Sequence, residues 1–239
     1  MPTTLRLLLV VATVTAAALG GAARALACGN SGGYSYAGLA SPSHAYGISA
    51  RVTPLPGFDV QNGHVAGWVG VGGPGEGPGG ADEWLQIGLS GFPGLTSNDV
   101  YYEVALPHGY PTYHRVAADV PYGKAVKVAV LEMHNRPDWW RVWLNRHPVS
   151  KPIRLPGSHG RWSPIATAES WDGGSGGACN GFLYSFENIA VAFAPGGGWH
   201  PLSSDETIKG PTTHLRRAHA SFIAAEGAEA FRSLLSLNP

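Results

Sequence analysis

Short segments in which hydrophobic and polar residues alternate are the clearest pattern in this chain of 239 residues. Between positions 84 and 89 every second residue is aliphatic (Leu85, Ile87 and Leu89). The intervening positions include Trp84 and Gln86. Because successive side chains of a strand point to opposite faces, this spacing predicts a β-strand with one face in the core.

The segment 100–106 shows the same alternation. Tyr101 and Glu103 lie opposite a predicted inward face made of Val100, Tyr102, Val104 and Leu106. A solvated sheet face usually carries small or charged polar residues, whereas these two segments present Trp, Tyr, Gln and Glu. A gathering of large aromatic and polar side chains is typical of a surface that binds a ligand.

Alternation and turn residues together predict about nine or ten strands. The main segments are 48–53, 64–71, 84–90, 100–106, 115–120, 124–132, 139–145, 162–171 and 182–194. In the segment 139–145 the predicted inward residues are Trp140, Val142 and Leu144, and the outward residues are Trp139, Arg141 and Trp143. No helical pattern separates the strands, which favours an all-β antiparallel sandwich or barrel.

The two ends of the chain differ from this central part. The pattern predicts a signal peptide over 1–27, a Gly/Pro-rich N-terminal arm over 28–63, a β-sandwich domain over 64–199 and a C-terminal extension over 200–239. Within the extension, residues 218–237 are rich in Ala and Glu, with Phe222, Phe231, Leu234 and Leu235 at near-helical spacing. That spacing predicts a short terminal helix or a weakly ordered tail.

The N-terminus has the three parts of a secretory signal. Arg6 precedes a short apolar, Ala-rich run, which ends in small-x-small sites that finish at Ala27. This order predicts cleavage and a secreted protein. The run is too rich in Ala, Gly and Thr for a membrane-spanning helix, and no later segment is long and apolar enough to cross a bilayer.

Two cysteines remain after that cleavage, Cys28 and Cys179. In an exported chain a pair of cysteines predicts a disulfide, and two free thiols are the alternative. Cys28 would also be the first mature residue, so attachment of a lipid is a lesser alternative. The lipobox requires Leu three positions before the Cys, whereas Leu26 lies two positions before it.

Composition excludes several kinds of function. The 16 basic and 16 acidic residues balance, and only 13% of residues are charged, which argues against a nucleic-acid partner. The ten histidines show neither an HExxH motif nor the spacing of a zinc site, so no metal and no cofactor is expected. The glycine-rich segment 173–177 contains G-x-S-x-G, but no helix is predicted after it, as a nucleophile elbow requires.

One pair of polar residues suits hydrolysis. Gln86 is a neutral amide on a predicted strand, and Glu169 is a carboxyl group on another, flanked by small residues on the alternate face. A carboxyl group can activate water and then protonate a leaving amine. An amide N–H can donate to a developing oxyanion without titrating.

These residues also lie in motifs that resemble a known family. Gly-Trp-Val-Gly-Val at 67–71, Leu-Gln-Ile-Gly at 85–88, Tyr-Tyr-Glu at 101–103 and Ala-Glu at 168–169 occur in the order seen in the glutamic peptidases, also called the G1 or eqolisin family. The separation of Gln86 and Glu169 is similar to that between the family's catalytic Gln and Glu. After Glu169, however, the family usually continues with Trp-Ile and an acidic residue, whereas Ser170, Trp171 and Asp172 follow here.

The resemblance implies a concanavalin A-like sandwich of two bent antiparallel sheets and a secreted, acid-optimal endopeptidase. Its substrate would be an extended or unfolded polypeptide, with Gln86 polarising the scissile carbonyl and Glu169 acting as general base and then acid. Trp68, Tyr101 and Glu103 would line the substrate groove beside Trp84. The alternatives are a non-catalytic module that binds a polysaccharide or a peptide, a glycosidase using Glu103 and Glu169, and ordinary exposed strand residues without a site.

Overall fold

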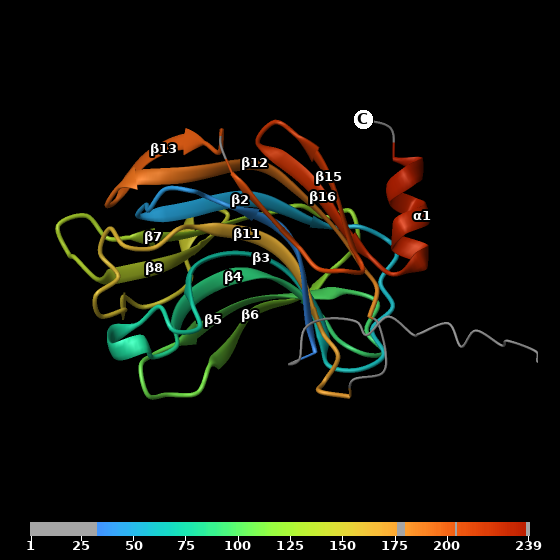
Figure 1. Ribbon diagram of the computed structural model, residues 1–239, viewed down its shortest axis with the longest axis horizontal. Helices are drawn as coiled ribbons and strands as arrows, with labels where there is room; N and C mark the ends of the chain where they lie inside the picture. The colour runs from blue at the N-terminus through green and yellow to red at the C-terminus, as the bar shows by residue number, and fades with distance from the viewer. Residues whose placement is uncertain (1–32, 176–179, 204, 238–239) are drawn as a thin grey trace, which may run out of the picture.

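The computed structural model describes residues 33–175, 180–203 and 205–237. Two antiparallel sheets face each other, and one short helix lies near the C-terminal end (Figure 1). This architecture confirms the predicted all-β sandwich. Within the described residues, no helix has both the length and the apolar character needed to cross a membrane. The predicted signal peptide and both cysteines lie outside the described residues.

The first sheet has seven strands. In spatial order they are β14 (Glu206–Lys209), β1 (Tyr34–Ala40), β11 (Ile165–Trp171), β3 (His64–Gly73), β4 (Glu83–Gly91), β5 (Asn98–Ala105) and β6 (Thr112–Val120). A 3-10 turn, η1 (Pro78–Gly80), lies between β3 and β4 in the chain. The order shows that β11, from late in the sequence, lies between β1 and β3.

The second sheet has nine strands. Its main path is β10 (Ile153–Arg154), β8 (Trp139–Leu144), β7 (Val126–Glu132), β2 (Gly47–Pro54), β12 (Phe182–Ala194), β16 (Ser221–Glu226) and β15 (Thr213–Ala218). Two further strands, β13 (Gly197–Pro201) and β9 (His147–Pro148), pair with β12 and β8. The strand order within each sheet therefore mixes early and late segments of the chain.

The core lies between the sheets and follows the predicted alternation. The inward residues of β4 are fully buried there (Leu85, Ile87 and Leu89), and so are Trp140 and Val142 of β8. One inward assignment is wrong: Leu106 is 42% exposed, because β5 ends at Ala105 and the alternation no longer applies.

Both ends of the described chain are built into the sheets. The segment expected as an N-terminal arm contains β1 and β2, and the expected C-terminal extension contains β14, β15 and β16. β1 pairs with β11 along its full length, from Tyr34 opposite Trp171 to Ala40 opposite Ile165. β2 matches the predicted strand 48–53, whereas the glycine-rich composition around β1, whose partner is distant in sequence, concealed that strand.

The predicted terminal helix is shorter than its pattern. The first part of 218–237 forms β16, and the second part forms the helix α1 (Ala228–Ser236). α1 lies beside β15 and β16 in Figure 1, and Leu234 packs with Leu183 of β12 in a small second cluster. Phe222 belongs instead to the main core, since strand alternation turns it inward.

Glu83, the first residue of β4, predicts a pH dependence of stability. Its side chain is fully buried, and neither carboxyl oxygen has a hydrogen-bond partner among the described residues. Burial is the main cause that raises the pKa of Glu83 from 4.5 to about 7, and the charge of Asp138 adds to it. The folded protein then keeps a proton that the unfolded chain releases. The free energy of unfolding therefore falls as pH rises from about 4.5 through about 7.

Glu83→Gln cannot titrate, so its fall in stability across this window is expected to be smaller by on the order of 1 kcal/mol. Urea unfolding of both proteins at the two pH values measures the difference. Glu76→Gln, at an exposed position of the loop before β4, serves as control and should follow the wild type. Parallel curves for wild type and Glu83→Gln would show that Glu83 has no raised pKa.

Candidate functional site

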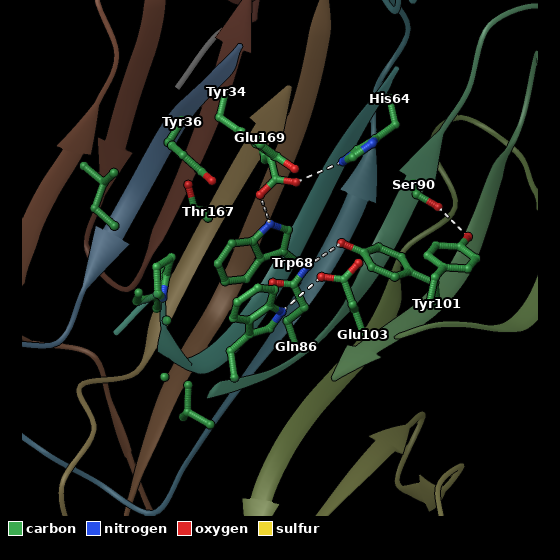
Figure 2. Close-up of a pocket in the computed structure, with 18 of the residues that line it drawn as sticks. Tyr34, Tyr36, His64, Trp68, Gln86, Ser90, Tyr101, Glu103, Thr167 and Glu169 are labelled. Atoms are coloured by element: carbon green, nitrogen blue, oxygen red, sulfur yellow. Dashed lines mark hydrogen bonds and ion pairs between the residues drawn. The ribbon is translucent and has the colours of Figure 1, made fainter. Parts of the chain in front are cut away.

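A pocket of about 780 Å³ is hollowed into the outer face of the seven-stranded sheet. It contains all six residues predicted for the site, namely Trp68, Trp84, Gln86, Tyr101, Glu103 and Glu169. They come from β3, β4, β5 and β11, and Figure 2 shows five of them, all except Trp84, labelled around the same space. The other predicted outward residues, Trp139, Arg141 and Trp143, lie on β8 in the second sheet and take no part in the pocket.

The carboxylate of Glu169 is held between two donors. Its Oε1 lies 3.0 Å from Nε2 of His64, and its Oε2 accepts a hydrogen bond of 3.1 Å from the indole N–H of Trp68 (Figure 2). Glu169 is only 6% exposed, and a carboxylate this buried is stable only where donors surround it. Each oxygen has two lone pairs, so a water or a ligand can still bind there.

Gln86 carries the neutral amide of the site. Its Nε2 donates a hydrogen bond of 3.1 Å to the hydroxyl oxygen of Tyr101, and its side chain is buried. An amide nitrogen has two N–H groups, so one can donate to a ligand. The Tyr101 hydroxyl accepts the bond from Gln86, which leaves its own proton to donate as well. Two neutral donors therefore lie together at this position.

Gln86 and Glu169 lie on strands that flank β3. Glu169 pairs with Ala66 of β3, and Gln86 pairs with Gly70. These partners are about 13 Å apart along the strand. Trp68 lies midway on the same face, and its indole contacts Glu169. No hydrogen bond joins Gln86 and Glu169 within the described ranges, so the two groups face the pocket from either side of Trp68.

A second carboxyl group, that of Glu103, lies in the same pocket. Its Oε1 accepts a hydrogen bond of 3.0 Å from the indole N–H of Trp84. Burial is the largest influence and raises the pKa of Glu103 above its ordinary value. The hydrogen bond from Trp84 lowers this pKa, the charge of Glu169 raises it further, and the charge interaction with His64 lowers it. Glu103 is thus more readily protonated than an exposed glutamate.

Three tyrosines around the carboxylates remain neutral. The pKa of Tyr34, Tyr36 and Tyr101 is raised chiefly by burial and then by the charge of Glu169. Their hydroxyls therefore keep their protons in neutral solution. Rings also stack at two sides of the pocket. The ring centroids of Tyr34 and Trp171 are 5.9 Å apart, and those of Tyr101 and Tyr113 are 5.0 Å apart. The result is a largely aromatic wall that carries neutral hydroxyls.

Sequence reasoning missed several residues of the pocket. Tyr34 and Tyr36 lie on β1, in a segment expected as an arm, although their spacing of two is a strand signal. The spacing of the histidines indicates no site for any of them, whereas His64 contacts Glu169. Its position four residues before Trp68 on one strand, and hence on the same face, was the available signal.

Gly70 makes room for the two side chains that flank it. A Cβ at this position would lie 2.9 Å from the Cβ of Gln86 and 3.1 Å from Cζ3 of Trp68. Gly70→Ala is therefore expected to displace both residues and to lower stability by about 1–3 kcal/mol. Any reaction that depends on the position of Gln86 should slow about 100-fold. Thermal unfolding measures the change in stability, and the rate of such a reaction measures the displacement of Gln86.

Gly109→Ala is the control for this substitution. Gly109 is exposed, and the atom nearest to a Cβ added there would be 3.4 Å away, which is an ordinary contact distance. It should leave stability and rate unchanged. A Gly70→Ala protein with wild-type rate would show that the site tolerates movement of Gln86 and Trp68.

The described residues contain no group of three or more His, Cys, Asp or Glu side chains arranged to hold a metal ion.

Comparison with known proteins gives a match in fold. No protein-family model matches the chain, and no curated protein matches it by sequence. A structure of scytalido-glutamic peptidase with a peptide-based transition-state analogue matches with 16% identity and a TM-score of 0.57, over 81% of this chain and 98% of that one. SCP-B, a member of the eqolisin family of peptidases in complex with the tripeptide Ala-Ile-His, matches with 16% identity and a TM-score of 0.54, over 82% and 98%. The chain therefore has the sandwich fold seen in these glutamic peptidases.

Proposed function

We propose that the protein is a peptidase that hydrolyses peptide bonds with Gln86 and Glu169. The observation that carries the proposal is one pocket in which a buried carboxylate and a neutral amide face the same space. The shared fold with glutamic peptidases, one of them bound to a peptide-based analogue and another to a tripeptide, supports it.

The hydrogen bonds suggest how the reaction would proceed. Glu169 removes a proton from a water molecule, whose oxygen attacks the carbonyl carbon of the scissile peptide bond. The second N–H of Gln86 and the hydroxyl of Tyr101 donate to the oxygen that becomes negative. Glu169 then gives its proton to the leaving nitrogen as the C–N bond breaks. The products are a carboxylic acid and an amine, and Glu169 returns to its starting state.

The form of the pocket indicates the class of substrate. Its lining combines aromatic rings with aliphatic residues such as Val71, Ile165 and Ile208, and the groups that act on a substrate lie on strands. A peptide must therefore be extended and free of its own fold to reach them. We infer an endopeptidase that acts on unfolded polypeptides and prefers apolar or aromatic side chains near the cleaved bond.

A second candidate function is non-catalytic binding of a polysaccharide or a peptide. The stacked aromatic rings of Tyr34, Tyr36 and Trp171 favour it, because sugar rings and peptide side chains pack on such surfaces. In that case Glu103 and Glu169 would accept hydrogen bonds from the ligand and transfer no proton.

We also propose that the protein is exported. Residues 1–27 would be removed as a signal peptide, and Cys28 would pair with Cys179 or, less favoured, carry a lipid. Mass spectrometry of the secreted protein, with and without reduction, distinguishes these outcomes.

Digestion of reduced and alkylated casein from pH 2 to pH 8 tests the peptidase proposal, with new peptide termini identified by mass spectrometry. The proposal predicts internal cleavages that depend on the added protein and that are absent when the same casein is incubated alone. Absence of cleavage at every pH, together with binding of soluble polysaccharides in calorimetry, would establish the binding module instead.

A further inference from the structure

His64 is a titratable residue of the pocket that has no role in the proposed mechanism. It begins β3 and lies on the same strand face as Trp68, with its Nε2 3.0 Å from Oε1 of Glu169. The His64 side chain is 25% exposed, against 8% for that of Glu169. The imidazole therefore lies at the mouth of the pocket and contacts the carboxylate from the solvent side.

Neighbouring rings hold the imidazole in this position. The centroid of its ring is 5.6 Å from that of Trp171 and 6.2 Å from that of Phe92. Trp171 in turn stacks on Tyr34. A ring packed between two aromatic side chains loses little further freedom when it bonds to Glu169, so the contact is preorganised.

His64 also has a special place in the charge balance. The titratable residues that line the pocket are His64, Glu103, Glu169, Tyr34, Tyr36, Tyr101 and Tyr113. Among these described lining residues, His64 is the one that can carry a positive charge. Asp172, the residue after Trp171, directs its carboxylate to the backbone N–H of Gly174. The imidazolium is thus placed to offset two carboxylates that repel each other.

We propose that His64 is a positioning residue for Glu169. With Trp68 on Oε2 and His64 on Oε1, the carboxylate is held at both of its oxygens. Its plane is thereby fixed while Glu169 takes a proton from the attacking water and later gives it to the leaving nitrogen.

This inference deepens the proposed peptidase function and rests on it. The functional site would comprise Gln86, Glu169 and His64.

Two substitutions separate the hydrogen bond from the ring. His64→Gln can still donate to Glu169 but lacks the ring. We expect kcat about tenfold below wild type. His64→Phe keeps a ring between Phe92 and Trp171 but removes the donor. We expect kcat to fall about 100-fold with KM within about twofold.

His147→Gln, on the exposed strand β9 of the other sheet, is the matched control and should leave kcat and the pH profile unchanged. Thermal unfolding shows whether each variant is folded. A folded His64→Phe protein with the kcat and pH profile of the wild type would overturn the proposal.

An NMR titration tests the pair without any need for activity. The ¹H–¹⁵N signals of the His64 imidazole are followed against pH in the wild type and in Glu169→Gln. Loss of the charged acceptor at Oε1 should shift the Nε2 signal of His64. Unchanged signals would refute the pair even if casein is cleaved. Shifted signals without cleavage would support the pair and count against the peptidase function alone.

Discussion

Replacing Glu169 by glutamine is expected to lower kcat for casein cleavage by at least about a thousandfold. General acid–base catalysis by a positioned side chain contributes about 10²–10⁴ in rate, and in the proposed mechanism one residue serves in both directions of proton transfer. Glutamine has nearly the same shape, and its carbonyl oxygen can accept the hydrogen bond from Trp68. The fold should therefore persist while the base is lost.

Initial rates of casein cleavage across the pH range measure the loss of activity. A thermal unfolding curve shows whether the fold persists. Glu187→Gln is the matched control, because Glu187 is exposed on β12 of the other sheet and should keep the full rate. Cleavage by a folded Glu169→Gln protein at more than about a tenth of the wild-type rate would remove Glu169 from the mechanism.

Removing the amide of Gln86 has the second largest expected effect. Gln86→Ala should lower kcat by about 10²–10³, the usual cost of losing one oxyanion donor, with a smaller change in KM. The Tyr101 hydroxyl would also lose the amide that positions it. Steady-state kinetics on a peptide taken from an observed cleavage site separates kcat from KM.

Gln61→Ala is the control for this variant, since Gln61 is an exposed loop residue whose side chain bonds only to Asp59 among the described residues. Combining Gln86→Ala with Glu169→Gln should cost much less than the sum of the single effects, because both groups act in one transition state. Fully additive losses would mean that the two residues act at separate steps.

Strand faces could be read from the sequence because alternation is local. Trp84 and Gln86 on β4, and Tyr101 and Glu103 on β5, all lie on the predicted face and in one pocket. The same argument correctly predicted that Trp140 of β8 lies in the core. In each case a few neighbouring residues contain the whole signal, so no tertiary information was needed.

The neighbours of each strand could not be read in this way. Trp143 has the same alternating pattern as Trp84 but belongs to the other sheet, because nothing local shows which sheet a strand joins. The contact of His64 with Glu169 joins residues 105 positions apart and depends on the register of β3 against β11. The family resemblance identified Glu169, whereas its imidazole partner emerged only from the structure.

The placement of β11 between β1 and β3 has a consequence for when the protein can act. The carboxylate reaches its donors only after strands from distant parts of the chain have paired, and such long-range pairing is slow to form. A nascent or partly unfolded chain could pair β4 with β5 and so position Gln86, while Glu169 would still lack Trp68 and His64 as partners. The proposed peptidase activity would therefore appear only once the seven-stranded sheet is complete.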